Sequence, residues 1–129
     1  MKRRDLLRIL SVLPSLGFAG RAMARVTEVR IQDSPIAGFQ YYAGELVRDR
    51  LRIGDALELR RAPANPYDRR AVEVWWHGHQ LGHLPRVENH TVAQMLDRGM
   101  PLHARIVSLQ DDPDPWKRVR FDIHLSTHA

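Results

Sequence analysis

The stretch RVRFDIHL, residues Arg118–Leu125, decides the fold class, because its apolar and polar residues alternate without a break. Val119, Phe121, Ile123 and Leu125 would lie on one face of an extended chain, with charged or polar side chains on the other. A period of two residues is typical of a half-buried β-strand and not of a helix. The stretch therefore predicts a strand with one face on a hydrophobic core.

Short apolar segments separated by turn residues precede this strand. Ala71–Trp76 and Gln80–Leu84 flank His77-Gly78-His79, and two such runs around a turn predict a β-hairpin. Val87–Arg98 has helical spacing instead, and Gly99 follows it as a stop signal. Further strands are expected at Arg25–Ile31, Ala56–Arg60 and Leu102–Leu109, and Phe39–Tyr42 is expected to be a short strand or a strand end. Glu45–Arg52 fits either a helical turn or a charged loop.

About six short strands and one clear helix predict a mainly β fold, either a small barrel or a curled sheet. The chain has 129 residues, of which 43% are hydrophobic and 27% charged, and this is room for one domain. The absence of cysteine excludes a disulfide framework, a thiolate metal site and a cysteine nucleophile. No apolar run approaches the roughly 18 residues of a membrane span, so no stable span is expected.

The first 24 residues are expected to be an export leader. Lys2, Arg3 and Arg4 form a basic start, an apolar stretch follows at Ile9–Gly20, and Ala22-Met23-Ala24 suits signal peptidase. The arginine pair is similar to a twin-arginine signal. The alternative is an amphipathic N-terminal helix of a cytosolic protein. The leader reading predicts a mature domain over residues 25–129 in the periplasm or outside the cell, whereas without a functional leader the protein would be cytoplasmic.

The net charge of +5 is concentrated in this leader. Residues 1–24 carry five basic residues and one acidic residue, whereas the remaining 105 residues carry 15 basic and 14 acidic residues. The domain itself is nearly neutral, so any nucleic-acid-binding surface must be a local patch.

The most specific stretch begins at Asn65-Pro66-Tyr67-Asp68 and continues as Arg69-Arg70-Ala71-Val72, with Gly82-His83-Leu84-Pro85-Arg86 downstream. Tyrosines beside arginines give the mixture of aromatic rings and cations found in single-strand binding sites. A carboxylate among phosphate-binding groups would repel the phosphates inside a nucleic-acid strand. It fits the end of such a strand, where a hydroxyl donor replaces a phosphate. The alternative is a plain β-turn, which Asn, Pro and Asp also favour.

These residues, with Gly38-Phe39-Gln40-Tyr41-Tyr42-Ala43-Gly44 upstream, resemble the HIRAN domain from about Ile31 to Leu125. This module occurs at the N-terminus of Swi/Snf-type DNA-repair helicases and as a stand-alone bacterial protein. The resemblance implies an OB-like, six-stranded β-barrel that binds single-stranded DNA with a preference for a free 3′ end. The ATPase motor of those helicases is absent from this chain, so no catalysis is expected.

The resemblance also assigns roles to individual residues. Tyr41 and Tyr67 would stack on bases, and Asp68 would accept a hydrogen bond from the terminal 3′-hydroxyl. Gln40 departs from the helicase members, in which this position is basic, and the change removes one phosphate contact. The same pocket would be completed by Tyr42, Asn65, His83 and Arg86.

Other candidate sites have simpler interpretations. His77, His79, His83 and His90 fall within 14 residues and could ligate zinc in a small hydrolase, but no cysteine and no HExxH pattern accompany them. We expect turn histidines and one pocket histidine, with no cofactor. The acidic loop Gln110–Trp116 is expected to be solvated and not to bind a cation. Trp75 and Trp76 are adjacent, so on a strand they would point to opposite faces and one of them would enter the core.

The sequence leaves two classes of binding function open. The first is a module for single-stranded nucleic acid that uses the pocket described above. The second is an exported envelope module whose pocket has been adapted to a protein, a glycan or extracellular DNA, since a fold does not fix a function.

Overall fold

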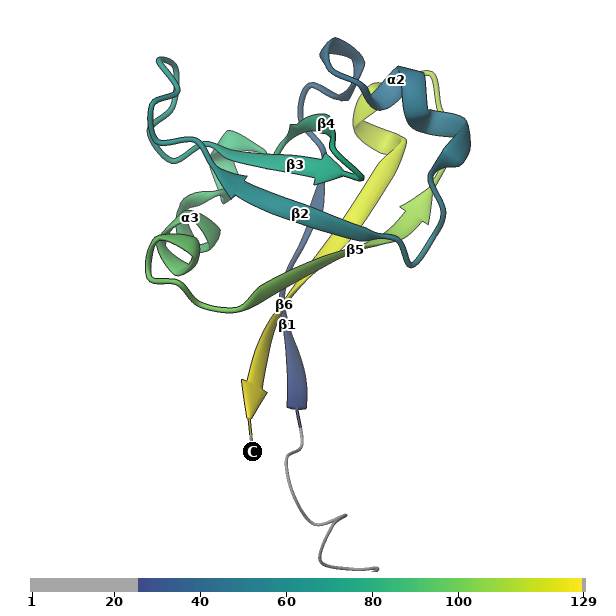
Figure 1. Ribbon diagram of the computed structural model, residues 1–129. Helices are drawn as coiled ribbons and strands as arrows, with labels where there is room; N and C mark the ends of the chain where they lie inside the picture. The colour runs from purple at the N-terminus through teal and green to yellow at the C-terminus, as the bar shows by residue number, and fades with distance from the viewer. Residues whose placement is uncertain (1–25, 129) are drawn as a thin grey trace, which may run out of the picture.

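In the computed structural model, which describes residues 26–128, six antiparallel strands form one sheet in the order β1-β6-β5-β2-β3-β4 (Figure 1). The strands are β1 Val26–Pro35, β2 Ala56–Arg61, β3 Val72–Trp76, β4 His79–His83, β5 Leu102–Leu109 and β6 Val119–His128. The helices are α2 Gly44–Val47 and α3 His90–Asp97, with 3₁₀ turns η1 Phe39–Tyr41, η2 Arg48–Arg50, η3 Arg86–Glu88 and η4 Pro115–Lys117. The expected leader, residues 1–24, lies outside the described residues.

The sheet is strongly curled but is not closed into a barrel. Its outer strands are β1 and β4, and the chain just beyond β1 meets β4 at one bridge. There the backbones of Ala37 and His83 exchange two hydrogen bonds of 2.8 and 2.9 Å. The fold is therefore mainly β and six-stranded, as the sequence predicts, with its two edges joined at this bridge and not along a full ladder.

Alternation along the strands places the hydrophobic core on the inner face of the curled sheet. Phe121 and Ile123 of β6 are fully buried, and the core also contains Trp76 of β3. Trp75 points to the outer face, where the guanidinium of Arg60 lies 4.0 Å from its ring centroid. The prediction that the two tryptophans point to opposite faces is confirmed. Within residues 26–128, no helix has the length and apolar character needed to cross a membrane.

The predicted hairpin is confirmed, with a two-residue turn at His77 and Gly78. Both residues have positive φ, 43° and 79°, as a type I′ turn requires. The predicted strand at Leu102–Leu109 coincides with β5, and the predicted strand at Arg118–Leu125 lies within one residue of β6 at its start.

The prediction of a short strand at Phe39–Tyr42 is wrong, because this segment forms the 3₁₀ turn η1. Gly38 has a φ of 76°, which reverses the chain after β1, and the Tyr41 N–H donates to the Gly38 carbonyl at 2.8 Å. The turn drives Phe39 into the core and leaves Tyr41 80% exposed. Two neighbouring aromatic residues therefore differ in burial, because Phe39 packs in the core and Tyr41 lies in solvent.

The helix predicted over Val87–Arg98 is shorter than expected and is preceded by the separate turn η3. The two parts meet at Asn89, which is only 1% exposed. Its carbonyl accepts from the Ala93 N–H at 2.8 Å, so α3 starts there. The break frees the Asn89 side chain for a contact outside the helix, and this contact belongs to the candidate site.

Candidate functional site

The loop between β2 and β3 is organised by the side chain of Asn65. Its Oδ1 accepts hydrogen bonds from the backbone N–H groups of Tyr67, at 2.9 Å, and Asp68, at 3.2 Å. This is an Asx turn, so the turn interpretation of the Asn-Pro-Tyr-Asp stretch is correct as local structure. The turn also has a consequence for binding, because it holds the Tyr67 ring 84% exposed to solvent.

Asp68 is held in place through both of its carboxylate oxygens. Oδ1 accepts from the backbone N–H of Arg70 at 2.9 Å, and Oδ2 accepts from the side-chain amide of Asn89 at 2.7 Å. Burial works to raise the pKa of Asp68, but these two hydrogen bonds and the charges of Arg86 and Arg70 outweigh it and lower the pKa below its ordinary value. The group is therefore a fixed anion at neutral pH, with lone pairs left to accept a further hydrogen bond.

Arg61 of β2 holds the same loop through hydrogen bonds to its backbone. Its guanidinium donates to the carbonyls of Ala71, at 2.7 Å, and Arg69, at 2.9 Å, and to a carboxylate oxygen of Asp97 at 2.8 Å. Because Asp97 ends α3, one arginine joins the loop to a strand and to the helix. The loop that carries Tyr67 is thus positioned by the scaffold.

The opposite wall of the site comes from the end of β4 and from the chain after β1. Gly82 has a φ of 150°, and a Cβ at this position would lie 2.3 Å from the Ala37 carbonyl oxygen. Only glycine allows the two backbones to approach closely enough for the bridge of Ala37 with His83. The bridge brings the His83 ring against the edge of the Tyr42 ring, with the ring centroids 5.3 Å apart.

These parts enclose an open hollow of about 260 Å³. Ala71 and Leu84, both buried, supply apolar surface, with Ala37 completing the lining. Six of the seven residues predicted from the sequence line this hollow, namely Tyr42, Asn65, Tyr67, Asp68, His83 and Arg86. The seventh, Tyr41, is not among the lining residues and projects from η1.

Positive charge gathers on one side of the hollow. Arg86 lines it from η3, and Arg69 and Arg70 are exposed on the loop that carries Tyr67. The Arg70 guanidinium donates to Nδ1 of His90 at 2.8 Å, which holds it beside the start of α3. Gln40, where the helicase members have a basic residue, lies in η1, is exposed and carries no charge. Cationic contacts are therefore supplied by the loop and η3.

Sequence reasoning missed Asn89, because this residue looked like part of a continuous helix. A signal was present, since asparagine is favoured at the start of a helix and the apolar positions Val92, Met95 and Leu96 all follow Asn89. Its partner Asp68 lies 21 residues away, and only the tertiary structure shows that the two meet.

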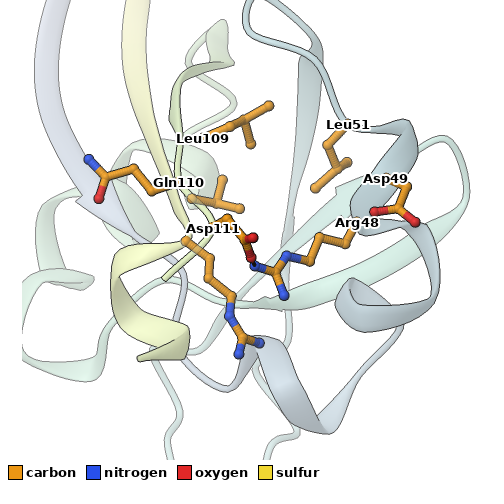
Figure 2. Close-up of a pocket in the computed structure, with 8 residues that line it drawn as sticks. Arg48, Asp49, Leu51, Leu109, Gln110 and Asp111 are labelled. Atoms are coloured by element: carbon orange, nitrogen blue, oxygen red, sulfur yellow. Dashed lines mark hydrogen bonds and ion pairs between the residues drawn. The ribbon is translucent and has the colours of Figure 1, made fainter. Parts of the chain in front are cut away.

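A second, larger hollow of about 380 Å³ lies between η2 and the acidic loop that follows β5 (Figure 2). Arg48 pairs with Asp111 across it, and Arg118 pairs with Glu45 of α2. Arg118 also donates to the carbonyl of Asp112 at 2.9 Å. The arginines here are already neutralised by carboxylates, so this network joins the acidic loop to α2 and offers no free cation to a ligand.

The remaining candidates do not assemble into a site within residues 26–128. No group of three or more histidine or carboxylate side chains there is arranged to hold a metal ion, and this includes His77, His79, His83 and His90. In the acidic loop, Asp112 and Asp114 accept hydrogen bonds from nearby backbone N–H groups. The carboxylates therefore have structural roles in the turn.

Comparison with known proteins concerns the family and the fold. The family model described as HIRAN domain matches residues 29–128. A crystal structure of a protein from Lactobacillus plantarum is 25% identical, with a TM-score of 0.67, and the match covers 81% of this chain and all of that one. The crystal structure of the HIRAN domain of human HLTF is 19% identical, with a TM-score of 0.57, and the match covers 84% of this chain and 82% of that one. No curated protein matches the chain.

Proposed function

Because the chain belongs to the HIRAN domain family, a family of nucleic-acid-binding modules, we propose that it binds the free 3′ end of single-stranded DNA and carries out no reaction on it. The observation that carries the proposal is the hollow of about 260 Å³, where exposed aromatic rings, a fixed carboxylate and a cation meet. A strand end offers a matching set of groups, namely a base, a terminal hydroxyl and a phosphate.

The base would be held by stacking. Tyr67 is 84% exposed, and the Asx turn beneath it already orders its backbone, so little entropy is lost when a base covers the ring. Tyr42 is held by its edge contact with His83 on the opposite wall. Stacking contributes about 1–3 kcal/mol per base and tolerates any base, so sequence preference should be weak. Tyr41, outside the lining, would contact the next nucleotide.

The terminal hydroxyl would be recognised by Asp68. Its carboxylate is ionised at neutral pH and oriented by Asn89 and by the Arg70 N–H, so it accepts a hydrogen bond but cannot donate one. A 3′-hydroxyl satisfies this acceptor, whereas a phosphate at the same position would bring two negative charges together. Asp68 therefore supports a preference for strand ends over internal positions.

The phosphate preceding the last nucleoside would be bound from the cationic side, by Arg86 and by the neighbouring Arg70. Both guanidiniums contribute to the lowered pKa of Asp68, which places their charge close to the same hollow. Arginine suits this role because its planar group can donate two parallel hydrogen bonds to phosphate oxygens.

The test compares fluorescein-labelled oligonucleotides that end in a 3′-hydroxyl or a 3′-phosphate, by anisotropy on the full chain. Wild-type protein should bind the hydroxyl end more tightly. Asp68→Asn keeps the shape of the side chain but removes its charge, so the two ends should bind equally. Tyr67→Ala should weaken binding of both ends by about tenfold or more. Asp49→Asn changes an exposed aspartate that lines the second hollow and not this one, so it is the matched control and should behave as wild type. Equal binding of both ends by wild type would refute end recognition.

Export is a separate proposal that rests on residues 1–24. A mature N-terminus near residue 25, found by mass spectrometry of the envelope fraction, would support it. If so, the nucleic acid available would be extracellular DNA, and the alternative of an envelope protein or glycan ligand would gain weight. An intact Met1 in the cytoplasmic fraction would refute export while leaving the binding proposal unchanged.

A further inference from the structure

One edge of the sheet has no partner strand within the described residues. β1 pairs only with β6, and its residues 27–30 are exposed. Figure 1 shows the start of β1 and the end of β6 projecting together beyond the rest of the sheet. Residues 26–28 of β1 pair there with residues 126–128 of β6. These pairs lie beyond the reach of β5, whose pairing with β6 begins at Leu102 and Leu125. We call this part of the two strands the arm.

Two-stranded ribbons are marginally stable alone and gain from a third strand. Native proteins protect a free edge by bulges, charges or short length. β1 has a bulge between Arg30 and Gln32, and this bulge prevents edge pairing only in the second half of the strand. The straight part before it carries Val29, which is 50% exposed, between the charged residues Glu28 and Arg30.

This short segment is complementary to itself. In an antiparallel pair with two-fold symmetry, one residue lies opposite its own copy and its neighbours lie opposite each other. A pair centred on Val29 places Glu28 opposite Arg30 twice and brings the two valines together. A pair centred on Glu28 or on Arg30 would instead place like charges opposite each other, which is unfavourable. Among these three registers, the charges thus favour the one centred on Val29.

The side chains of Glu28 and Arg30 can exchange their present ion-pair partners for those of a second copy. Within the chain, Glu28 reaches Arg105 at 4.0 Å, and Arg30 reaches Asp122 at 3.7 Å. Both contacts are long, and the Arg30 side chain is 63% exposed. The pair of Glu28 with Arg105 is exposed, and exposed ion pairs contribute little to stability, so Glu28 changes partner at little cost. The Asp122 side chain is only 13% exposed, but His124 Nε2 also lies 3.8 Å from it, so Asp122 keeps a neighbour when Arg30 turns to a second copy.

We propose that the protein forms a two-fold symmetric dimer by antiparallel pairing of β1 with β1 of a second copy, centred on Val29. The two sheets then become one continuous sheet through residues 28–30 of each copy, which form the straight part of β1 before the bulge. None of the residues that line the hollow belongs to the arm, so both hollows stay open and the dimer holds two strand ends. Because few residues pair, the interface is small and the dimer is weak and concentration-dependent.

Cysteine crosslinking tests the register directly, since the chain contains no native cysteine. In Val29→Cys the two thiols lie directly opposite, with Cβ atoms about 5 Å apart, within reach of a disulfide after backbone adjustment. In the control Thr27→Cys, residue 27 lies opposite residue 31 of the other copy, so the two thiols are roughly 14 Å apart. Mild oxidation of the full chain should give a covalent dimer with Val29→Cys at least about tenfold faster than with Thr27→Cys. Equal rates, or faster crosslinking of Thr27→Cys, would overturn the register.

Charge reversal tests the attraction. Analytical ultracentrifugation should show that Glu28→Arg and Arg30→Glu each weaken dimerisation by about tenfold or more, because each replaces two opposite-charge pairs by like-charge pairs. A mixture of the two variants restores complementarity and should dimerise again. Arg98→Glu, an exposed reversal at the end of α3, should dimerise like wild type. A wild-type protein that stays monomeric up to about 1 mM, or single variants that dimerise like wild type, would refute the proposal.

Discussion

Removing the side-chain amide of Asn89 is the most informative single change in the candidate site. Asn89→Ala deletes the 2.7 Å hydrogen bond to Oδ2 of Asp68 and leaves the Arg70 N–H bond to Oδ1 in place. A hydrogen bond to a charged group contributes about 1.5–3 kcal/mol. Because Asp68 is half-buried and water can reach it, we expect the low end, about 1.5 kcal/mol of unfolding free energy. For a domain of this size this corresponds to a fall in Tm of roughly 6–12 °C.

The same change has a predictable pH dependence. The pKa of Asp68 is lowered in the folded protein, so its ionised form stabilises the fold above the ordinary aspartate value of 3.8. This stabilisation is lost as the pH falls through the lowered pKa. In Asn89→Ala the pKa should rise toward its ordinary value, so the stability difference between variant and wild type should be full at pH 7 and should shrink below pH 3.8.

Urea unfolding followed by tryptophan fluorescence at pH 7 and pH 3 measures both effects. An NMR titration of the Asp68 carboxyl carbon should report the rise in pKa directly. Thr91→Ala, an exposed residue in the first turn of α3, is the matched control for a general effect on the helix. A stability loss that is as large at pH 3 as at pH 7 would refute the reasoning, since the lost contact would then not depend on the charge of Asp68.

Three further outcomes are expected. Gly82→Ala should lower the unfolding free energy by about 3 kcal/mol in urea titrations, because the new Cβ would lie 2.3 Å from the Ala37 carbonyl oxygen at a φ of 150°; a neutral result would contradict the close approach. Arg61→Met should weaken oligonucleotide binding about fivefold by anisotropy, since the loop carrying Tyr67 loses its three anchors; unchanged affinity would show that the loop is ordered without them. If about two phosphates are bound by Arg70 and Arg86, the logarithm of affinity should fall against the logarithm of salt with a slope of about −1.4; a slope near zero would exclude phosphate contacts.

Alternation predicted most of the sheet because it depends only on local geometry. β5 coincides with Leu102–Leu109 since an outward side chain follows nearly every inward one, and the hairpin turn was marked by Gly78. The turn at Phe39–Tyr41 was not predictable in this way. Its shape depends on Phe39 reaching the core beside Gly44, where a Cβ would lie 2.6 Å from the aromatic ring. The two residues are only five positions apart, but a packing contact of this kind leaves no periodic pattern in the sequence.

The sequence indicated most of the residues of the candidate site, but not how the fold brings them together. Asn65, Tyr67 and Asp68 are adjacent in sequence, so one turn could bring them together. His83 and Arg86 required the curled sheet, and the resemblance to a family supplied this information before the structure did. Periodicity offered no reason to separate Asn89 from the helix that follows it, although this residue orients the central carboxylate.

The position of Asp68 separates two kinds of nucleic-acid site that otherwise look alike. A surface that only tracks phosphates gains from every cation and loses from every carboxylate, so a fixed anion beside Arg70 and Arg86 would be a defect. Here two hydrogen bonds and two guanidiniums keep that anion charged in spite of burial. Such an arrangement stabilises a ligand only where the nucleic acid presents a hydrogen-bond donor in place of a phosphate, and the terminal hydroxyl of a DNA strand is such a donor. The charge of Asp68, more than the tyrosines or the arginines, is therefore the feature that argues for end binding over general single-strand binding.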